Sequence, residues 1–422
     1  MSVEVAAAVA RLAAWLRTMR QPGGFAGPVA HWWQDCLLYT GPGLDWRYEG
    51  ILAGYRLLYE RTGRPEFRER LREAAGDLLA GQRADGHYRG SRFEQNPGVL
   101  GTPHEAAATL GLLWALPHLA DRDAALAAAG RNLVALVDRL WDPRAGGFDD
   151  RPGVPGRVPN KLATMAEALL LHAEAADTEV WLPKARAALD AVVAYQVPSG
   201  PLTGAVHQYA PGAGAGDGRF FPYYNARCVP PLVLGARVLA TERYRQAAEG
   251  IVAFLERSAD QDGLWPQIVY SGGGRAPRPR WIAGAGDILR ALRAMGRSVP
   301  EAALRRLLAG QLPSGGVRSA EGFAQPFGGR APAGPPDWRD LLPVVGWNDK
   351  ALRLLCEFLP EGAELPKVGV EPVELPCRFA GRPAVFREDE REVAVIAQGG
   401  AVRYRWMKAD AWAMDGQRGR LP

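Results

Sequence analysis

Six glycine-centred turns recur along the chain, and each follows a stretch with the hydrophobic pattern of an amphipathic helix. The intervals between successive turns are 62, 60, 54, 63 and 52 residues, and the central glycines are Gly24, Gly86, Gly146, Gly200, Gly263 and Gly315. Self-similarity at a fixed period of this length is typical of repeat architectures. Each interval is long enough for two helices and two loops, so the pattern predicts six helical hairpins.

The two helices of each hairpin differ in character. Those after the turns are apolar nearly all round, as expected of buried helices, and they should begin near Trp46, His104, Asn160, Asn225, Trp281 and Trp347. The intervening helices, such as the one within 64–82, carry arginine and glutamate on one face and are expected to be outer helices. Apolar inner helices need neighbours, and only a closed ring leaves no exposed end. We therefore expect an all-α fold, a closed (α/α)6 toroid over residues 1–367. The proline pair Pro230-Pro231 should kink the fourth inner helix or make it start late.

Residues 368–422 break the helical pattern. Short alternating stretches, Val393 to Ile396 and Val402 to Trp406, are joined by Gly399-Gly400. They predict a small C-terminal β appendage containing a hairpin. Such an addition favours a binding role or a homodimer. A glycine-rich segment at 210–218 is expected to be a surface loop, with a lid over a pocket as the alternative.

Composition excludes several function classes. Hydrophobic residues make up 47% and charged residues 23%, as in soluble globular proteins, and no apolar run reaches the length of a membrane helix. The N-terminal stretch predicts an amphipathic helix and no signal peptide, so we expect a cytoplasmic protein. The basic residues are scattered, which argues against nucleic-acid binding. The net charge of +5 still allows attraction of anionic substrates.

Cysteine usage gives no sign of a metal or disulfide site. The four cysteines, Cys36, Cys228, Cys356 and Cys377, are far apart and form no CxxC pair. We expect neither a disulfide framework nor a zinc site, and no cofactor.

Several fragments resemble known toroids. "DWRYEGILAGYRLLYERTGRPEFRERL" is similar to a helix hairpin of unsaturated glucuronyl hydrolases, and "WDPRAGGFDD" followed by "NKLATMAEALLLHAEA" to the acylglucosamine 2-epimerase group. This resemblance to the six-hairpin glycosidase superfamily covers about residues 1–360 and implies a carbohydrate substrate. "QRADGHY" matches a repeat of terpenoid cyclases and prenyltransferases. However, their D-x-D-D motif and zinc set are absent, as is the zinc motif of lanthionine cyclases.

Polar and aromatic residues gather at the six expected inner-helix starts. In a toroid these starts meet at one end of the central cavity, where helix dipoles favour anions. Aromatic faces, carboxylates and arginines there suit a sugar or uronate. The residues expected to be catalytic are His104, Glu105, Glu49 and Asp349. Those expected to bind the substrate are Trp46, Arg47, Lys161, Tyr224, Asn225, Arg227, Trp281, Trp338, Arg339, Trp347, Asn348 and Lys350.

Each of these residues also has a purely structural interpretation. Asp, Asn and Glu at a helix start commonly cap it or compensate its dipole, but capping requires no tryptophan, arginine or histidine. His104 is the first candidate because a histidine there can titrate near neutral pH. Its alternative role is a hydrogen bond to a loop carbonyl. His31 is the second candidate, whereas His87 is expected on the surface at the opposite end.

The sequence leaves the chemistry open. Hydrolysis needs two carboxyl groups, for which the candidates are Asp45 or Glu49 with Glu105, or Asp349 with Asp337. A lyase or epimerase needs a base and a cation, and His104, Tyr224, Arg227 and Lys161 fit those roles. The leading hypothesis is a glycoside hydrolase, lyase or sugar epimerase acting on a small-molecule or oligosaccharide substrate. The alternatives are a terpenoid cyclase or prenyl-transfer enzyme and a non-catalytic scaffold in a biosynthetic complex.

Overall fold

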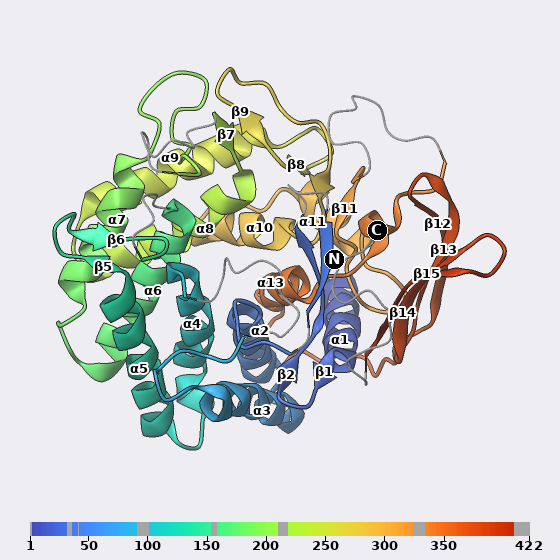
Figure 1. The fold of residues 1–422 in the computed structure, drawn as a ribbon, viewed down its shortest axis with the longest axis horizontal. Helices are drawn as coiled ribbons and strands as arrows, with labels where there is room; N and C mark the ends of the chain where they lie inside the picture. The colour runs from blue at the N-terminus through green and yellow to red at the C-terminus, as the bar shows by residue number, and fades with distance from the viewer. Residues whose placement is uncertain are drawn as a thin grey trace.

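The protein is helix-rich, and its helices alternate along the chain between an inner and an outer set (Figure 1). The computed structural model describes residues 2–31, 36–40, 42–90, 101–152, 158–209, 218–323 and 334–408. The inner helices are α2 (Arg47–Thr62), α4 (Ala106–Ala115), α6 (Pro159–Ala176), α8 (Pro222–Val238), α10 (Ala285–Ala294) and α13 (Val345–Cys356). The outer helices are α1 (Ser2–Thr18), α3 (Pro65–Gly81), α5 (Arg122–Leu140), α7 (Leu182–Ala194), α9 (Glu242–Ser258) and α11 (Glu301–Ala309).

Each inner helix packs against the next one along the chain, and α13 packs against α2. Two glycines of α2 allow this last approach. A Cβ on Gly50 would lie 2.5 Å from a carboxylate oxygen of Asp349, and one on Gly54 would lie 3.0 Å from the side chain of Leu352. The last inner helix therefore lies directly against the first.

The inner helices begin close to where the sequence predicts them. Of the two alternatives for the fourth one, a kink or a late start, the late start does not occur, because α8 begins at Pro222 and continues through Pro230 and Pro231. Pro222 occupies the first turn, where backbone N–H groups have no acceptor within the helix, so the proline removes no helical hydrogen bond.

The six glycine turns hold the outer layer together. All six central glycines have a positive φ, the conformation that glycine adopts without strain. Close packing adds a second requirement at two of them. A Cβ on Gly86 would lie 2.7 Å from the carbonyl oxygen of Arg131 in α5, and one on Gly315 would lie 2.3 Å from that of Arg11 in α1. These turns therefore pack directly on the backbone of another outer helix.

A glutamine at the end of an outer helix fixes three of these turns. The side-chain amide donates to a carbonyl of its own turn and to a carbonyl of the next outer helix. The acceptors are Gly86 and Ala128 for Gln82, Gly204 and Ala247 for Gln196, and Gly315 and Ala8 for Gln311, at 2.8 to 3.1 Å. Gln311 thereby links α11, the last outer helix, to α1, the first.

The C-terminal strands form a four-stranded antiparallel sheet in chain order, and it lies beside α1 (Figure 1). Its strands are β12 (Val373–Phe379), β13 (Arg382–Glu388), β14 (Glu392–Ala397) and β15 (Val402–Met407). Glu388 is fully buried and accepts hydrogen bonds from Trp15 Nε1 at 2.7 Å, Ser314 Oγ at 2.6 Å and Lys408 Nζ at 3.1 Å. These buried contacts fasten the sheet to the helical part.

Short elements fill the connections. They comprise the 3-10 turns Pro103–Glu105 and Leu116–His118, α12 (Trp338–Leu341), β1 (Arg20–Gln21), β2 (Gly24–Phe25), β3 (Gly27–His31), β4 (Cys36–Thr40), β5 (Trp141–Asp142), β6 (Gly147–Phe148), β7 (Arg219–Phe220), β8 (Trp265–Pro266), β9 (Val269–Tyr270), β10 (Arg280–Trp281) and β11 (Ala320–Glu321). In the described part of the chain, no helix has the length and apolar character needed to span a membrane.

We expect the Gln311→Leu variant to lose about 1–3 kcal/mol of unfolding free energy, because the carbonyl groups of Ala8 and Gly315 would lose their donor. Urea denaturation followed by circular dichroism measures this loss. The matched control is Gln246→Leu, at an exposed position of α9, which should change stability by less than about 0.5 kcal/mol. Equal effects of the two substitutions would contradict a specific role for the Gln311 amide.

Candidate functional site

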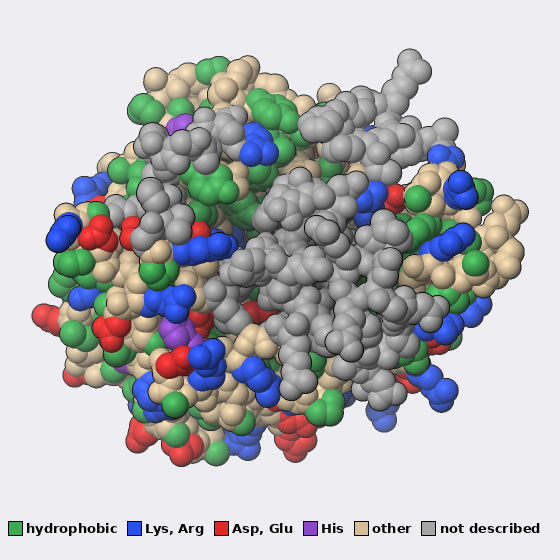
Figure 2. Space-filling view, in the orientation of Figure 1, with side chains coloured by type: hydrophobic (Ala, Val, Ile, Leu, Met, Phe, Trp, Pro, Cys, Tyr) green, Lys and Arg blue, Asp and Glu red, His purple; other side chains and the backbone are tan. Residues whose placement is uncertain are grey.

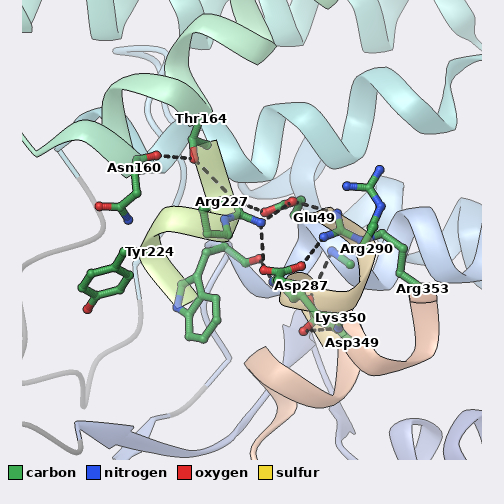
Figure 3. Close-up of polar contacts among 12 residues, drawn as sticks. Glu49, Asn160, Thr164, Tyr224, Arg227, Asp287, Arg290, Asp349, Lys350 and Arg353 are labelled. Carbon is green, nitrogen blue, oxygen red and sulfur yellow. Dashed lines mark hydrogen bonds and ion pairs between the residues drawn. The ribbon is translucent and has the colours of Figure 1, made fainter. Parts of the chain in front are cut away.

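Four charged side chains from four inner helices meet at a buried position between these helices. Glu49 of α2 receives two hydrogen bonds from Arg227 of α8, at 2.6 and 2.7 Å, and one from Arg353 of α13 at 2.8 Å. Asp287 of α10 receives one from each arginine, at 3.2 Å from Arg227 and 2.5 Å from Arg353. Thr164 of α6 also contacts Arg227 at 3.4 Å. We call these four charged side chains the ion-pair layer (Figure 3).

The ion-pair layer is buried and stays charged near neutral pH. Burial favours the neutral form of Glu49, but the positive charges of Arg227 and Arg353 outweigh it and hold the pKa of Glu49 well below its usual value. The same two arginines lower the pKa of Asp287 against burial. Two carboxylates and two guanidinium groups balance each other, so the layer carries no net charge.

Asp349 and Lys350 form a second buried pair beside the layer. Asp349 Oδ2 accepts from Lys350 Nζ at 2.7 Å and from the backbone N–H of Gly50 at 3.1 Å. Burial raises the pKa of Asp349 to about 7, although the charge of Lys350 opposes this change. Lys350 Nζ also donates to the carbonyl of Trp46 at 2.7 Å. This pair therefore joins the starts of α13 and α2.

An aromatic and basic cluster lies at the inner-helix starts. The rings of Trp46 and His104 stack with centroids 6.3 Å apart, and Lys350 Nζ lies 4.6 Å from the centre of the Trp46 ring. Both rings are partly exposed. On the face shown in Figure 2, hydrophobic side chains gather near α8, and basic side chains lie beside them.

His104 does not titrate near neutral pH, which corrects the expectation from the sequence. Burial, reinforced by the positive charges of Arg227 and Lys161, lowers its pKa to about 3. The imidazole is therefore neutral over the physiological range and has one nitrogen able to accept a proton.

More polar groups of α6 and α8 belong to this end of the ring. Lys161 Nζ lies 2.8 Å from Asp150 Oδ1, and burial lowers the pKa of Lys161 although Asp150 opposes it. Tyr224 is partly exposed, and Figure 3 shows it on the same side of the ion-pair layer as Asn160. Trp281 and Trp347 pack edge to face, with centroids 4.4 Å apart.

Three predicted site residues instead use their side chains to hold the backbone. The amides of Asn225 and Asn348 both donate and accept hydrogen bonds with the backbone, at Val206 and Val317 respectively. Glu105 accepts from the N–H groups of Tyr88 and Gly101 and from Asn132. These side chains fix the glycine turns to the inner-helix starts, so we leave them out of the proposed site.

His87 also lies at this end of the ring, which corrects its expected position at the opposite end. Its Nδ1 is 3.0 and 3.1 Å from the two carboxylate oxygens of Glu105. This hydrogen bond raises the pKa of His87 against partial burial. The turn that carries His87 therefore packs on the start of the inner helix, since an outer helix ends where the next inner helix begins.

Three other predicted residues contact partners outside this cluster. Arg47 is buried in a salt bridge to Asp45, with nitrogen and oxygen 2.7 Å apart, and Arg339 pairs in the same way with Asp337 at 2.7 Å. Trp338 packs on Phe379 of the C-terminal sheet, with ring centroids 5.7 Å apart. The side chain of His31 and the 210–217 segment lie outside the described residues, so nothing is assigned to them.

Sequence reasoning missed Asp287 and Arg353, which complete the ion-pair layer. Both lie in inner helices that also carry other charged residues, Arg290 and Arg293 in α10 and Asp349 and Lys350 in α13, so neither charge stood out in the sequence. Within the described residues, no group of three histidine, cysteine, aspartate or glutamate side chains could hold a metal ion.

Comparison with known proteins supports the architecture. An unsaturated glucuronyl hydrolase specific for heparin superposes with a TM-score of 0.60 at 13% identity, covering 84% of this chain and 95% of its own. For the cellobiose 2-epimerase of Spirochaeta thermophila the TM-score is 0.59 at 17% identity, covering 83% and 96%. A D-mannose isomerase gives 0.59 at 15% identity, covering 84% and 96%. No protein-family model matches the sequence, and no curated protein does. At these identities the likeness shows a shared fold, which agrees with the resemblance seen in the sequence.

We expect the Glu49→Gln variant to be destabilised by about 3–5 kcal/mol, because Arg227 and Arg353 would then share a single buried carboxylate. Chemical denaturation measures the loss. The matched control is Glu69→Gln at an exposed position of α3, which should cost less than about 0.5 kcal/mol. A loss no larger than that of the control would show that the layer contributes little to stability.

We expect the imidazole of His104 to stay neutral from pH 8 down to pH 5, because its folded pKa is about 3. The ¹⁵N shifts of the ring, assigned with a His104→Asn sample, should remain constant over this range. Those of His87 should change, because its pKa is raised. A half-protonation point for His104 between pH 6 and 7 would contradict the partly buried environment flanked by cations.

Proposed function

We propose that the protein is a carbohydrate-active enzyme of the epimerase, isomerase or lyase type, with its site at the inner-helix starts around His104. The observation that carries the proposal is the neutral imidazole beside Trp46, with the charges of Lys161 and Arg227 acting on it. A base next to cations suits removal of a proton from a carbon adjacent to a carbonyl or carboxylate group, because the cations stabilise the negative charge that develops.

Paired carboxylates give hydrolysis less support. Each carboxylate in the predicted acid–base pairs already has a partner. Glu49 lies in the ion-pair layer, Glu105 binds His87 and backbone N–H groups, and Asp349 pairs with Lys350. Asp45 and Asp337 each bind a neighbouring arginine. Glycoside hydrolysis requires one of two facing carboxyl groups to hold a transferable proton, and Arg227 and Arg353 oppose this at Glu49. Asp349, with a pKa of about 7, could hold a proton, but its two carboxylate oxygens already accept hydrogen bonds from Lys350 and from the N–H of Gly50.

Binding of an anionic substrate would make His104 a stronger base. His104 has a low pKa partly because Arg227 and Lys161 repel an added proton. A substrate carboxylate or a developing enolate between these groups would offset that repulsion and raise the histidine's pKa towards neutrality. The partly exposed faces of Trp46 and Tyr224 would stack on the apolar face of a sugar ring.

The known structures similar to this chain include a sugar epimerase and an isomerase, and also unsaturated glucuronyl hydrolases, so they are compatible with this proposal and with hydrolysis. At these identities their likeness supports the fold, and the assignment of an activity rests on the cluster itself. A terpenoid cyclase would need a dry apolar chamber, whereas four charges occupy the centre of this ring. A non-catalytic scaffold would not require the cluster of aromatic and basic side chains around His104.

The architecture around the site is part of the proposal. We infer that the inner helices close into a toroid, because α13 packs on α2 and Gln311 bridges the last and first outer helices. We keep residues 1–367 as the toroid and 368–422 as an extension. A homodimer through the C-terminal sheet remains a prediction.

We expect turnover to appear as exchange of a carbon-bound proton. The enzyme would be incubated in D2O with aldoses, ketoses, reducing disaccharides, unsaturated uronides and polyuronates, and followed by ¹H NMR. The signal of the proton beside the carbonyl or carboxylate should disappear during epimerisation or isomerisation, and a new vinyl signal should mark elimination. Loss of the base in His104→Asn should lower the rate by about a hundredfold or more.

The matched control for this assay is His118→Gln. That histidine pairs with Glu60 beyond the C-terminal end of α4 and should be dispensable. Release of a reducing sugar without proton exchange would favour hydrolysis instead. Full activity of the His104→Asn variant would reject the site, and silence on the whole panel would favour a scaffold.

A further inference from the structure

Along the inner helices, side chains become more exposed to solvent again beyond the ion-pair layer, on the side away from His104. On α6, Thr164, Glu167 and Leu171 share one face, because they follow at helical spacing. Thr164 meets the ion-pair layer and is 1% exposed, and Glu167 is still buried at 8%, whereas Leu171, four residues further on, is partly exposed. On α8, Leu234 lies seven residues after Arg227 on the same face and is also partly exposed. Side chains beyond the ion-pair layer therefore regain contact with solvent. We call this region the far end.

Arginine and tryptophan side chains meet at the far end. The guanidinium carbons of Arg290 and Arg353 lie 5.6 and 5.5 Å from the ring centre of Trp114 in α4. Figure 3 shows the guanidinium of Arg290 and the ring of Tyr224 on opposite sides of the ion-pair layer. Arg290 donates through Nε to Glu357 at 3.1 Å. Its two terminal nitrogens make no hydrogen bond to residues that the structure describes, so they are available to a ligand.

Glu167 is the group that this arrangement leaves unexplained. It is more than nine-tenths buried, yet its carboxyl group makes no hydrogen bond or ion pair with the described part of the chain. Charged groups of four helices face it. They are Arg290 of α10, Glu49 of α2, Arg227 of α8 and Arg353 of α13, while α4 contributes the uncharged Trp114. A buried carboxyl group without a hydrogen-bond partner costs free energy, so its presence suggests that a ligand supplies the missing partner.

We propose that the far end is a second binding site, for a small organic carboxylate whose anionic group is held by Arg290 and Glu167 and whose apolar body contacts Trp114, Leu171 and Leu234. The guanidinium donates N–H groups to the carboxylate, and the carboxyl group of Glu167, when protonated, donates its O–H to the same anion. This site lies across the ion-pair layer from His104 and does not depend on the proposed activity.

The charge balance favours an anion over a cation. Burial raises the pKa of Glu167 to about 7, with Glu49 adding to the shift and Arg290 opposing it, so the carboxyl group is largely neutral in slightly acidic solution. Arg290 then supplies the local charge. The C-terminal end of a helix carries a partial negative charge that would repel an anion, but only within the last turn. Glu167 lies nine residues before the end of α6, so this repulsion does not act at the proposed site.

Binding should therefore be linked to protonation of Glu167. An anion favours the protonated form, so affinity is highest below pH 7 and falls as the carboxyl group ionises. With a pKa near 7, raising the pH from 6 to 8.5 should weaken binding by about tenfold or more.

The test is calorimetric titration of the full chain with benzoate at pH 6 and pH 8.5, with benzamide as the uncharged analogue. We expect benzoate to bind with the pH dependence given above and benzamide to bind far more weakly. Arg290→Gln should weaken benzoate binding by about tenfold or more. Arg297→Gln, an exposed position just beyond α10, is the matched control and should bind like the unmodified chain.

Glu167→Gln separates a binding role from a purely structural one. The amide keeps a donor and cannot ionise, so this variant should bind benzoate at pH 6 and lose the pH dependence. Crystals soaked in 4-bromobenzoate should show the anomalous bromine signal beside Trp114. Absence of benzoate binding would overturn the proposal. So would unchanged pH dependence in Glu167→Gln, loss of binding in His104→Asn, or tighter binding of benzylamine than of benzoate.

Discussion

The two carboxylates of Glu49 and Asp287 lie buried between the inner helices and depend on the guanidinium groups of Arg227 and Arg353. A buried charge without a partner costs several kcal/mol, so these four side chains must meet for the helices to pack. Each comes from a different position in the chain, and α2, α8, α10 and α13 are held in register by them. The ion-pair layer also divides the axis, with the His104 cluster on one side and Glu167 on the other. Both proposed sites therefore depend on it.

The outer helices are held together mainly by contacts between backbones at the glycine turns. Glycines with positive φ let the turns pack directly on the backbone of another outer helix, and Gln82, Gln196 and Gln311 satisfy the carbonyls that such packing leaves buried. The inner-helix starts are then fixed to the same turns by Asn225, Asn348 and Glu105. Polar residues at helix starts thus divide into those that secure the turns and those that remain for a ligand.

This division explains why the fold was more predictable than the site. The period of the glycine turns and the apolar helices required only local patterns, and the inner helices begin close to their expected positions. The role of an asparagine or a histidine depends on what stands opposite it. Asn348 resembles a pocket residue in sequence, but its amide is used by the backbone of Val317. His104 resembles a group that titrates near neutral pH, but burial and the charges of Arg227 and Lys161 keep it neutral.

The stretch "GWNDKALRLL", residues 346–355, shows within ten residues what the sequence determines and what it does not. By itself the sequence determined that an apolar helix follows a polar, aromatic start, because spacing and composition are local properties. Only the tertiary structure decided what each residue does. Trp347 packs against Trp281, Asn348 holds a turn, Asp349 and Lys350 join α13 to α2, and Arg353 enters the ion-pair layer. These partners lie between 31 and 304 positions away along the chain. Their meeting depends on how all the inner helices pack together, which no local pattern encodes.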